Sequence, residues 1–299
     1  MRSWRWLAGA LVILGVAMEA LRAGPPLPAP VERGGYVVLA VDFHVHSFLG
    51  DGALPPWFLV DQARRRGLDA IAITNHNRTW PARLARWLTR GADAPIVLVG
   101  EEVTSRAFHI TAIGVEQPVD WRHSAADAIE AIHAQGGVAI AAHPASQFWP
   151  AYDDRALREL DGAERAHASI FQDRRADRQF AIFFNDVRSV NPTVAAIGAS
   201  DFHVVGYPGI CRTYVFARER SARGIIEAVR AGRTVVYDKY GRLRGDPALF
   251  PLMPADSRTE LRTAPRPGPG SVVVWLGLLG LVLLGGGRRR PRESSVSGG

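Results

Sequence analysis

Short apolar runs rich in β-branched residues alternate with helix-like stretches through the middle of this chain. Six of these runs are predicted to be buried strands: 36–41, 70–74, 96–99, 110–115, 138–142 and 194–197. Proline in a first turn or serine at an N-cap opens four predicted helices: 57–66, 82–90, 125–135 and 222–231. Repeated alternation of strand and helix favours a parallel α/β fold. The length of this middle part fits a single (β/α) barrel.

The two ends of the chain have a different character. Arg2 and Arg5 precede the apolar stretch 7–18 and a run of small residues, which is typical of a secretory signal, with an uncleaved anchor as the alternative. Residues 271–287 are uncharged and largely apolar, and the arginines 288–290 follow at once. This order favours a transmembrane helix with a cytoplasmic tail. A buried core helix is the alternative for 271–287.

These features predict six segments. They are a signal peptide or membrane anchor at 1–24, a linker at 25–36, one α/β domain at 37–237, a proline-rich linker at 238–270, a transmembrane helix at 271–287 and a basic cytoplasmic tail at 288–299. The basic residues flanking both apolar ends place the domain on the periplasmic or extracytoplasmic side of a bacterial cell membrane. The C-terminal helix would be its membrane contact.

The net charge of +7 reflects these ends more than the domain. Residues 1–24 and 271–299 together carry five of the seven excess charges, so only +2 remains between them. No nucleic-acid partner is therefore expected. The single cysteine, Cys211, excludes an internal disulfide framework.

Histidines and carboxylates gather at the ends of the predicted strands. His44 and His46 follow the first strand, and because residues two apart in extended chain point the same way, both imidazoles can face one ion. The other candidates at or near strand ends are Asp51, His76, Glu102, His109, His143, Asp201 and His203. In a barrel the C-terminal strand ends form one active-site mouth. Nine ligands exceed the need of one tetrahedral zinc, which favours two or three metal ions bridged by a carboxylate.

The remaining histidines lie elsewhere in the pattern. His123, His133 and His167 do not fall at the predicted strand ends. We expect them to be structural or to face solvent.

Five short motifs, in this order, resemble those of the PHP superfamily (polymerase and histidinol phosphatase). They are Asp42-Phe43-His44-Val45-His46-Ser47 with Gly50-Asp51-Gly52, then Ile73-Thr74-Asn75-His76, Gly100-Glu101-Glu102, Ala142-His143-Pro144 and Ser200-Asp201-Phe202-His203. The resemblance covers about residues 37–237 and implies a distorted seven-stranded TIM-like (β/α) barrel with a metal-dependent phosphoesterase or related hydrolase site.

The resemblance also implies how the ligands divide. A first metal would be held by His44, His46, Glu102 and Asp201. Glu102 would bridge to a second metal bound by His109 and His143, and a third would be held by Asp51, His76 and His203. The segment 211–215 with 225–234 resembles the carbaryl-hydrolase (CehA/McbA-type) branch of the family.

Two residues depart from the family pattern. The family usually has aspartate before, and often after, the position of His76, whereas this chain has Asn75 and Asn77. An asparagine there can orient a ligand but supplies no negative charge.

The predicted reaction is hydrolysis of a small-molecule phosphate ester. A water that bridges two ions loses its proton near neutral pH and attacks phosphorus, while the ions stabilise the developing charge. Asp201 and His203 are the candidate catalytic acids, and Arg78 is a candidate contact for an anionic group, with a solvated surface arginine as the alternative. Histidine and carboxylate ligands suit zinc, manganese and iron alike.

Two other functions stay open at this point. The first is a carbamate, ester or amide hydrolase that uses the same metals, which the carbaryl-hydrolase resemblance motivates. The second is a metal-binding module that has lost turnover, which Asn75 and Asn77 motivate.

Overall fold

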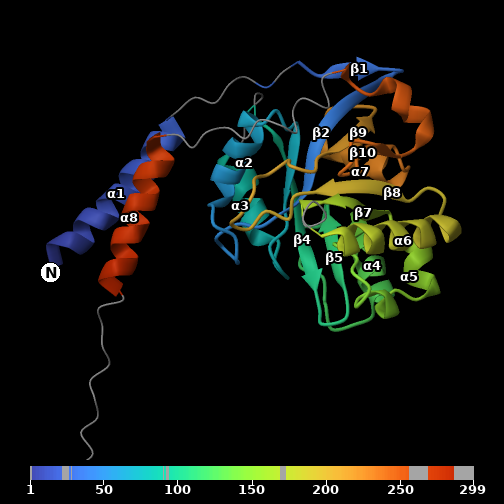
Figure 1. Ribbon diagram of the computed structural model, residues 1–299, viewed down its shortest axis with the longest axis horizontal. Coiled ribbons are helices and arrows are strands. Elements are labelled where there is room, and N and C mark those ends of the chain that lie inside the picture. Colours follow the sequence, from blue (N-terminus) through green and yellow to red (C-terminus); the bar gives the residue numbers. More distant parts are fainter. Residues whose placement is uncertain are drawn as a thin grey trace, which may run out of the picture. The chain divides into compact units, whose positions relative to one another are not determined.

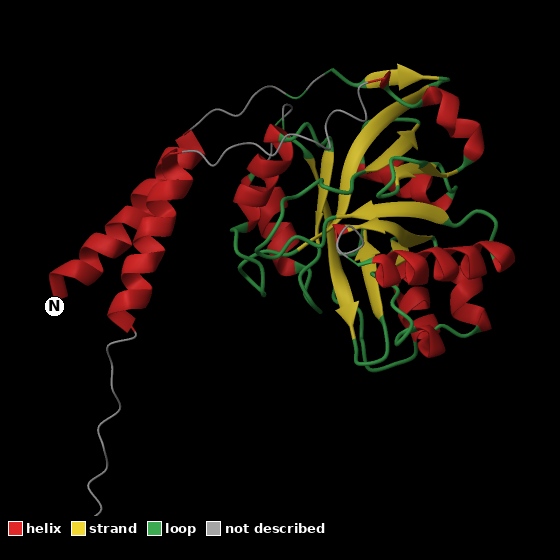
Figure 2. Ribbon diagram, viewed as in Figure 1, coloured by secondary structure: helices red, strands yellow, loops and turns green. Residues whose placement is uncertain are grey.

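The computed structural model describes residues 2–21, 27, 29–89, 91, 94–168, 173–255 and 269–285. The chain divides into two compact units, one of residues 25–264 and one of residues 1–24 with 265–299. In the larger unit the strands form a central curved sheet with helices on its outer side (Figures 1 and 2).

The strands of the larger unit are β1 (Val31–Arg33), β2 (Tyr36–Val45), β3 (Ala70–Ile73), β4 (Ile96–Thr104), β5 (His109–Ile113), β6 (Val138–Ala141), β7 (Gly162–His167), β8 (Ala195–Ala199), β9 (Thr213–Ala217), β10 (Thr234–Tyr237) and β11 (Leu243–Gly245). Its α-helices are α2 (Pro56–Arg65), α3 (Trp80–Leu88), α4 (Ala125–Ala134), α5 (Asp154–Glu159), α6 (Arg174–Val190) and α7 (Ala222–Arg230), with short 3-10 helices η1 (Trp149–Ala151) and η3 (Pro247–Leu252). All six predicted strands and all four predicted helices of this unit are present.

Strands β2 to β8 curve into a nearly closed barrel. Each is hydrogen-bonded to the next in chain order. After β8 the chain returns to β2 through a parallel bridge between Phe202 and Val45, and the Asp201 N–H donates to the His44 carbonyl at 2.9 Å. Within the described residues these seven strands form a nearly closed barrel, which agrees with the TIM-like fold that the family resemblance implied.

The sheet is mixed rather than parallel throughout. Strands β2, β3 and β4 run parallel, and so do β6, β7 and β8, but β5 is antiparallel to both of its neighbours. Strands β9, β10 and β11 extend the sheet from β2 in antiparallel fashion. The expectation of an all-parallel sheet is therefore wrong. The short connection between Thr104 of β4 and His109 of β5 permits antiparallel pairing without a crossover helix.

Helix α7 lies across the barrel end at which β4 and β6 begin. Arg230 near its end donates to the carbonyls of Gly136 and Gly137, just before β6. Ile225 and Val229 of this helix pack with the apolar core inside the barrel, which includes Phe43. The core thus fills one end of the barrel and leaves the other end to polar side chains.

Part of the segment predicted as a proline-rich linker is ordered. Strand β11 pairs with β10, and η3 packs Leu249 against the core. The rest of that linker, 256–268, lies outside the described residues, as does the predicted tail 288–299.

The smaller unit contains α1 (Arg2–Leu21) and α8 (Pro269–Gly285), which contact each other. No helix in the described part of the chain is long and apolar enough to cross a membrane. The transmembrane helix predicted for 271–287 is therefore not found: the 17 residues of α8 span about 25 Å, against a hydrocarbon core of about 30 Å. The same finding leaves the predicted signal or anchor at 1–24 without structural support, and the extracytoplasmic location stays a prediction.

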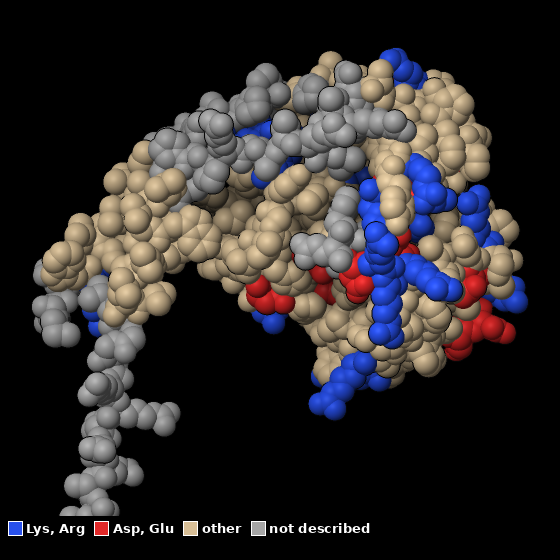
Figure 3. All heavy atoms as spheres, viewed as in Figure 1, with Lys and Arg blue, Asp and Glu red and all other residues tan. Residues whose placement is uncertain are grey.

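The surface charge of the larger unit is mixed on the face shown in Figure 3. Lysine and arginine side chains there lie beside aspartate and glutamate side chains. This agrees with the small excess charge of the middle of the chain.

Candidate metal centre

Strand β2 directs two histidines into the barrel. Its pairing with β3 shifts register between Asp42 and Val45, and a bulge of this kind re-aims the side chains that follow it. Phe43 consequently packs in the barrel core, while His44 and His46 beyond it also point inward and are fully buried. The Nε2 atoms of the two imidazoles lie 2.9 Å apart.

The reversed direction of β5 brings a further histidine to the same mouth. His109 begins β5 and lies opposite Thr104, at the end of β4. Because the two strands are antiparallel, the start of β5 and the end of β4 share one end of the barrel. The Nδ1 atom of His109 accordingly reaches Glu102 Oε1 at 2.6 Å.

Three residues of this mouth have left-handed backbone conformations that side chains other than glycine rarely adopt. The φ angles are 27° at His143, 47° at Asp201 and 51° at Asn77. Such conformations persist only where the surroundings hold them, and they cluster at functional sites. The N–H of each is tied down: His143 donates to Glu164 Oε2, Asp201 to the His44 carbonyl and Asn77 to the Glu102 carbonyl.

A first group of donors is buried at the centre of the mouth. Glu102 Oε2 lies 3.4 Å from His44 Nε2 and 3.3 Å from His46 Nε2. Asp201 Oδ1 lies 3.2 Å and 3.3 Å from the same two nitrogens. Four side chains from β2, β4 and the end of β8 thus direct one atom each at a common point.

The two carboxylate oxygens of this group fit a metal ion. Within the described residues, neither Glu102 Oε2 nor Asp201 Oδ1 has a hydrogen bond of acceptable geometry, although both are buried. Burial alone would lower the pKa of His46, but hydrogen bonds to Asp201, Asp51 and Glu102 raise it to about 10. The carboxylates therefore favour positive charge among these imidazoles. A divalent ion supplies that charge as well as protons do.

Glu102 also belongs to a second group. Its other oxygen, Oε1, lies 2.6 Å from His109 Nδ1 and 3.0 Å from His143 Nε2. One carboxylate therefore faces both groups, which is the arrangement of a bridging ligand. The ring of Phe148 lies 4.8 Å from the ring of His109 and covers this group from one side.

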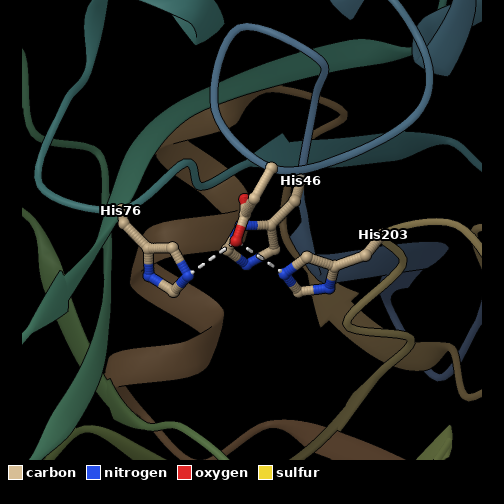
Figure 4. A group of neighbouring side chains, drawn as sticks. His46, His76 and His203 are labelled. Carbon is tan, nitrogen blue, oxygen red and sulfur yellow. Dashed lines mark hydrogen bonds and ion pairs between the residues drawn. The ribbon is translucent and has the colours of Figure 1, made fainter. Parts of the chain in front are cut away.

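A third group is more open to solvent. Asp51 Oδ2 lies 3.1 Å from His76 Nε2 and 3.3 Å from His203 Nε2, and Asp51 Oδ1 lies 3.1 Å from His46 Nδ1. Figure 4 shows the imidazoles of His46, His76 and His203 converging from separate elements. The hydrogen bond from His46 holds the pKa of Asp51 well below its usual range. His46 thus contacts two groups, one through each ring nitrogen.

Comparisons with known proteins agree with this geometry. The structure resembles a crystal structure from Bacteroides vulgatus, described as a two-domain protein containing a predicted PHP-like metal-dependent phosphoesterase, with a TM-score of 0.53 and 24% sequence identity over 73% of this chain and 69% of that one. The chain thus has the fold of that PHP-like protein. The family resemblance expected from the motifs is thus confirmed at the level of the fold.

Two curated proteins resemble the sequence. An uncharacterised protein of Methanocaldococcus jannaschii is 28% identical over 138 residues, which are 42% of this chain and 80% of that protein. The phosphoribosyl 1,2-cyclic phosphate 1,2-diphosphodiesterase of Eggerthella lenta is 35% identical over 82 residues, which are 25% of this chain and 31% of that enzyme. No family model matches the sequence.

The two asparagines that depart from the family pattern, Asn75 and Asn77, hold the site loops together. Asn75 accepts a hydrogen bond from the Ser47 hydroxyl at 2.8 Å and donates to the Ser47 carbonyl at 2.9 Å. Asn77 accepts from the Thr104 N–H at 2.8 Å and donates to the Thr104 carbonyl at 3.0 Å. Each amide uses its oxygen as acceptor and its nitrogen as donor, and a carboxylate cannot replace the donor.

Arg78 uses its guanidinium on the backbone of the same loops. It donates to the carbonyl of His76 at 3.2 Å and to that of Leu49 at 3.1 Å. These bonds join the loop that carries Asp51 to the loop that carries His76. A contact with substrate, which the sequence suggested for Arg78, stays a prediction.

Sequence reasoning missed two residues of the site, both on β7. Glu164 is fully buried and lies 2.8 Å from His44 Nδ1, and His167 Nε2 lies 3.4 Å from Asp201 Oδ2. His167 was expected to be structural or to face solvent, and it is instead buried beside Asp201. The register of β7 shifts between Glu164 and Ala166 and turns residues three apart to the same face. The inward-pointing side chains of Glu164 and His167 interrupt the apolar pattern that would have identified β7 as a strand.

The other two histidines lie away from the site, as expected. His133 binds Asp161 at 2.7 Å beside the start of β6 and β7. His123 is exposed and lies 3.6 Å from Asp120.

Proposed function

We propose that this PHP-like protein is a metal-dependent hydrolase, and specifically a phosphoesterase acting on a small-molecule phosphate ester. The observation that carries the proposal is the position of Glu102. Its two oxygens face two separate groups of histidines, and one of these oxygens is buried without an adequate hydrogen bond. The phosphodiesterase of Eggerthella lenta, similar to part of this chain, supports phosphate esters as the substrate class.

In this proposal the nine histidine and carboxylate side chains hold the ions. His44, His46, Glu102 and Asp201 hold one, Glu102 with His109 and His143 holds a second, and the open group of Asp51, His76 and His203 holds a third. The donor chemistry suits zinc, manganese or iron. Bound divalent ions supply an activated water and a positive charge opposite the ester oxygens.

Asp201 and His203, the two candidate proton donors, differ in burial and in the charges around them. Burial would raise the pKa of Asp201, but His44 and contacts with His167 and His46 outweigh it and lower the pKa well below its usual range. These surroundings favour the carboxylate form of Asp201, which suits a metal ligand. His203 is about one-third exposed and lies at the open side, where its Nε2 atom faces Asp51. Proton donation to the leaving group, the other role expected of Asp201 and His203, stays a prediction.

The test is a substrate panel on the purified full chain. The protein is stripped with a chelator, reloaded with Mn²⁺ or Zn²⁺, and given a phosphomonoester, a phosphodiester, a carboxylic ester and a carbamate. We expect hydrolysis of a phosphate ester that requires added metal and that Glu102→Gln abolishes. If carboxylic ester or carbamate is hydrolysed and both phosphate esters are untouched, the carbaryl-hydrolase-like alternative replaces the proposal.

The non-catalytic alternative has less support. It was motivated by Asn75 and Asn77, and both amides make paired hydrogen bonds that keep the site loops in place. Their replacement of aspartate is explained by these bonds without loss of turnover. Metal binding with no hydrolysis of any of the four substrates would reinstate this alternative.

A further inference from the structure

A second buried carboxylate lies inside the barrel beneath the nine proposed ligands. Glu164, on β7, is fully buried, and each of its oxygens has its own partner. Oε1 lies 2.8 Å from Nδ1 of His44, and Oε2 accepts a hydrogen bond from the backbone N–H of His143 at 2.6 Å. Glu164 therefore contacts one member of each of the two buried groups.

Both partners need an acceptor at this position. The Nε2 atom of His44 faces Glu102 and Asp201. A metal bound at Nε2 leaves the ring proton on Nδ1, and an acceptor at Nδ1 then fixes the orientation of the ring. His143 has a strained φ of 27°, and its N–H must be satisfied inside the protein. One carboxylate meets both needs.

We propose that Glu164 is a positioning residue that orients His44 and His143 together and so couples the geometry of the two buried metal groups. It directs no atom at the ions itself and acts through the two histidines. The inference rests on the proposed metal centre but not on the identity of the substrate.

The two contacts require a carboxylate rather than an amide. Both partners are donors, and glutamine of the same size presents an acceptor to only one of them, while its NH₂ group meets the other. His167, from the same strand, is almost fully buried, and its Nε2 atom lies 3.7 Å from Glu164 Oε2. Glu164→Gln therefore removes one contact without changing the side-chain volume.

The same strand offers a matched control. Asp161, directly before β7, accepts from His133 Nε2 at 2.7 Å and from the Ala139 N–H at 2.8 Å. It thus has the same two kinds of partner as Glu164, one imidazole and one backbone amide, but lies near the opposite end of the strand. Asp161→Asn perturbs a partly buried imidazole–carboxylate pair without touching the proposed ligands.

The experiment measures metal affinity rather than turnover. Full-length wild type, Glu164→Gln and Asp161→Asn are stripped of metal and titrated with Zn²⁺ and with Co²⁺, and the visible absorption spectrum of bound Co²⁺ is recorded. We expect affinity in Glu164→Gln to fall about 10- to 100-fold, with an altered Co²⁺ spectrum, as for other partners behind metal ligands. Asp161→Asn should bind with wild-type affinity and an unchanged spectrum.

Three results would decide against the proposal or against its premise. Wild-type metal affinity and an unchanged Co²⁺ spectrum in Glu164→Gln would overturn the proposal. An equal loss of metal affinity in Asp161→Asn would overturn it too, because the effect would then be one of general stability. Should Glu164→Gln not fold, Glu164→Asp takes its place, since the shorter stem cannot reach both donors; unchanged affinity there has the same meaning. If wild type itself binds no metal, the proposed function fails instead.

Discussion

His44 and His46 direct their Nε2 atoms at each other across 2.9 Å inside the barrel, and both side chains are fully buried. Two neutral imidazole nitrogens at this distance repel each other unless a proton or a metal ion lies between or beside them. The oxygens of Glu102 and Asp201 lie within 3.4 Å of the same nitrogens. The pair therefore marks the point at which the first ion would bind.

Glu102→Gln should remove metal from both buried groups at once. Each oxygen of Glu102 faces a different group, and an amide keeps only one acceptor. We expect activity to fall by at least about 100-fold and the metal content to drop, measured by elemental analysis.

Glu101→Gln is the matched control for that variant. Glu101 is the neighbouring buried glutamate, and it accepts from the Val119 N–H on the other side of the sheet. Metal content equal to wild type in Glu102→Gln, or an equal loss in Glu101→Gln, would contradict the bridging role.

Restoring the family's aspartates should harm the protein. In Asn75→Asp and Asn77→Asp, a carboxylate oxygen would face the carbonyl of Ser47 or Thr104 in place of an N–H donor. We expect each substitution to lower the free energy of unfolding by about 1–3 kcal/mol, measured by denaturant titration, and to lower activity. A gain of activity in either variant would show that the asparagines mark degeneration of the site.

Gly52→Ala should release the third ion before the other two. A Cβ at Gly52 would overlap the carbonyl of His46, so the loop that carries Asp51 must move. We expect the metal-to-protein ratio to fall by one while the buried groups keep their ions. Gly91→Ala, where a Cβ meets open space, is the control, and an unchanged ratio in Gly52→Ala would argue against a metal at Asp51.

The pair of His133 and Asp161 should stabilise the fold in a pH-dependent way. The hydrogen bond to Asp161 raises the pKa of His133 above its ordinary value of 6.5; burial and Arg230 oppose this rise, and Glu159 adds to it. The stabilisation is fully present below pH 6.5 and is lost as the pH rises through the raised pKa. His133→Gln should therefore reduce the unfolding free energy more at pH 6 than at pH 9, and an equal loss at both values would contradict the shift.

The positions of six strands, and the gathering of nine candidate ligand side chains at one mouth, could be predicted from the sequence because apolar runs end at polar residues that the barrel places together. The direction of β5 could not, since His109 starts a strand in either direction and only the pairing of Thr104 with His109 shows that it is antiparallel. Strand β7 was missed because Glu164 and His167 point inward where an apolar side chain is expected. Their contacts depend on a register shift that no local pattern reveals.

The metal content of the purified full chain tests the central claim most directly. Elemental analysis after reloading with Mn²⁺ or Zn²⁺ should find two or three divalent ions per chain, all removed by a chelator, and metal-dependent hydrolysis of a phosphate ester should return with them. A chain that binds no divalent ion under these conditions would contradict the account.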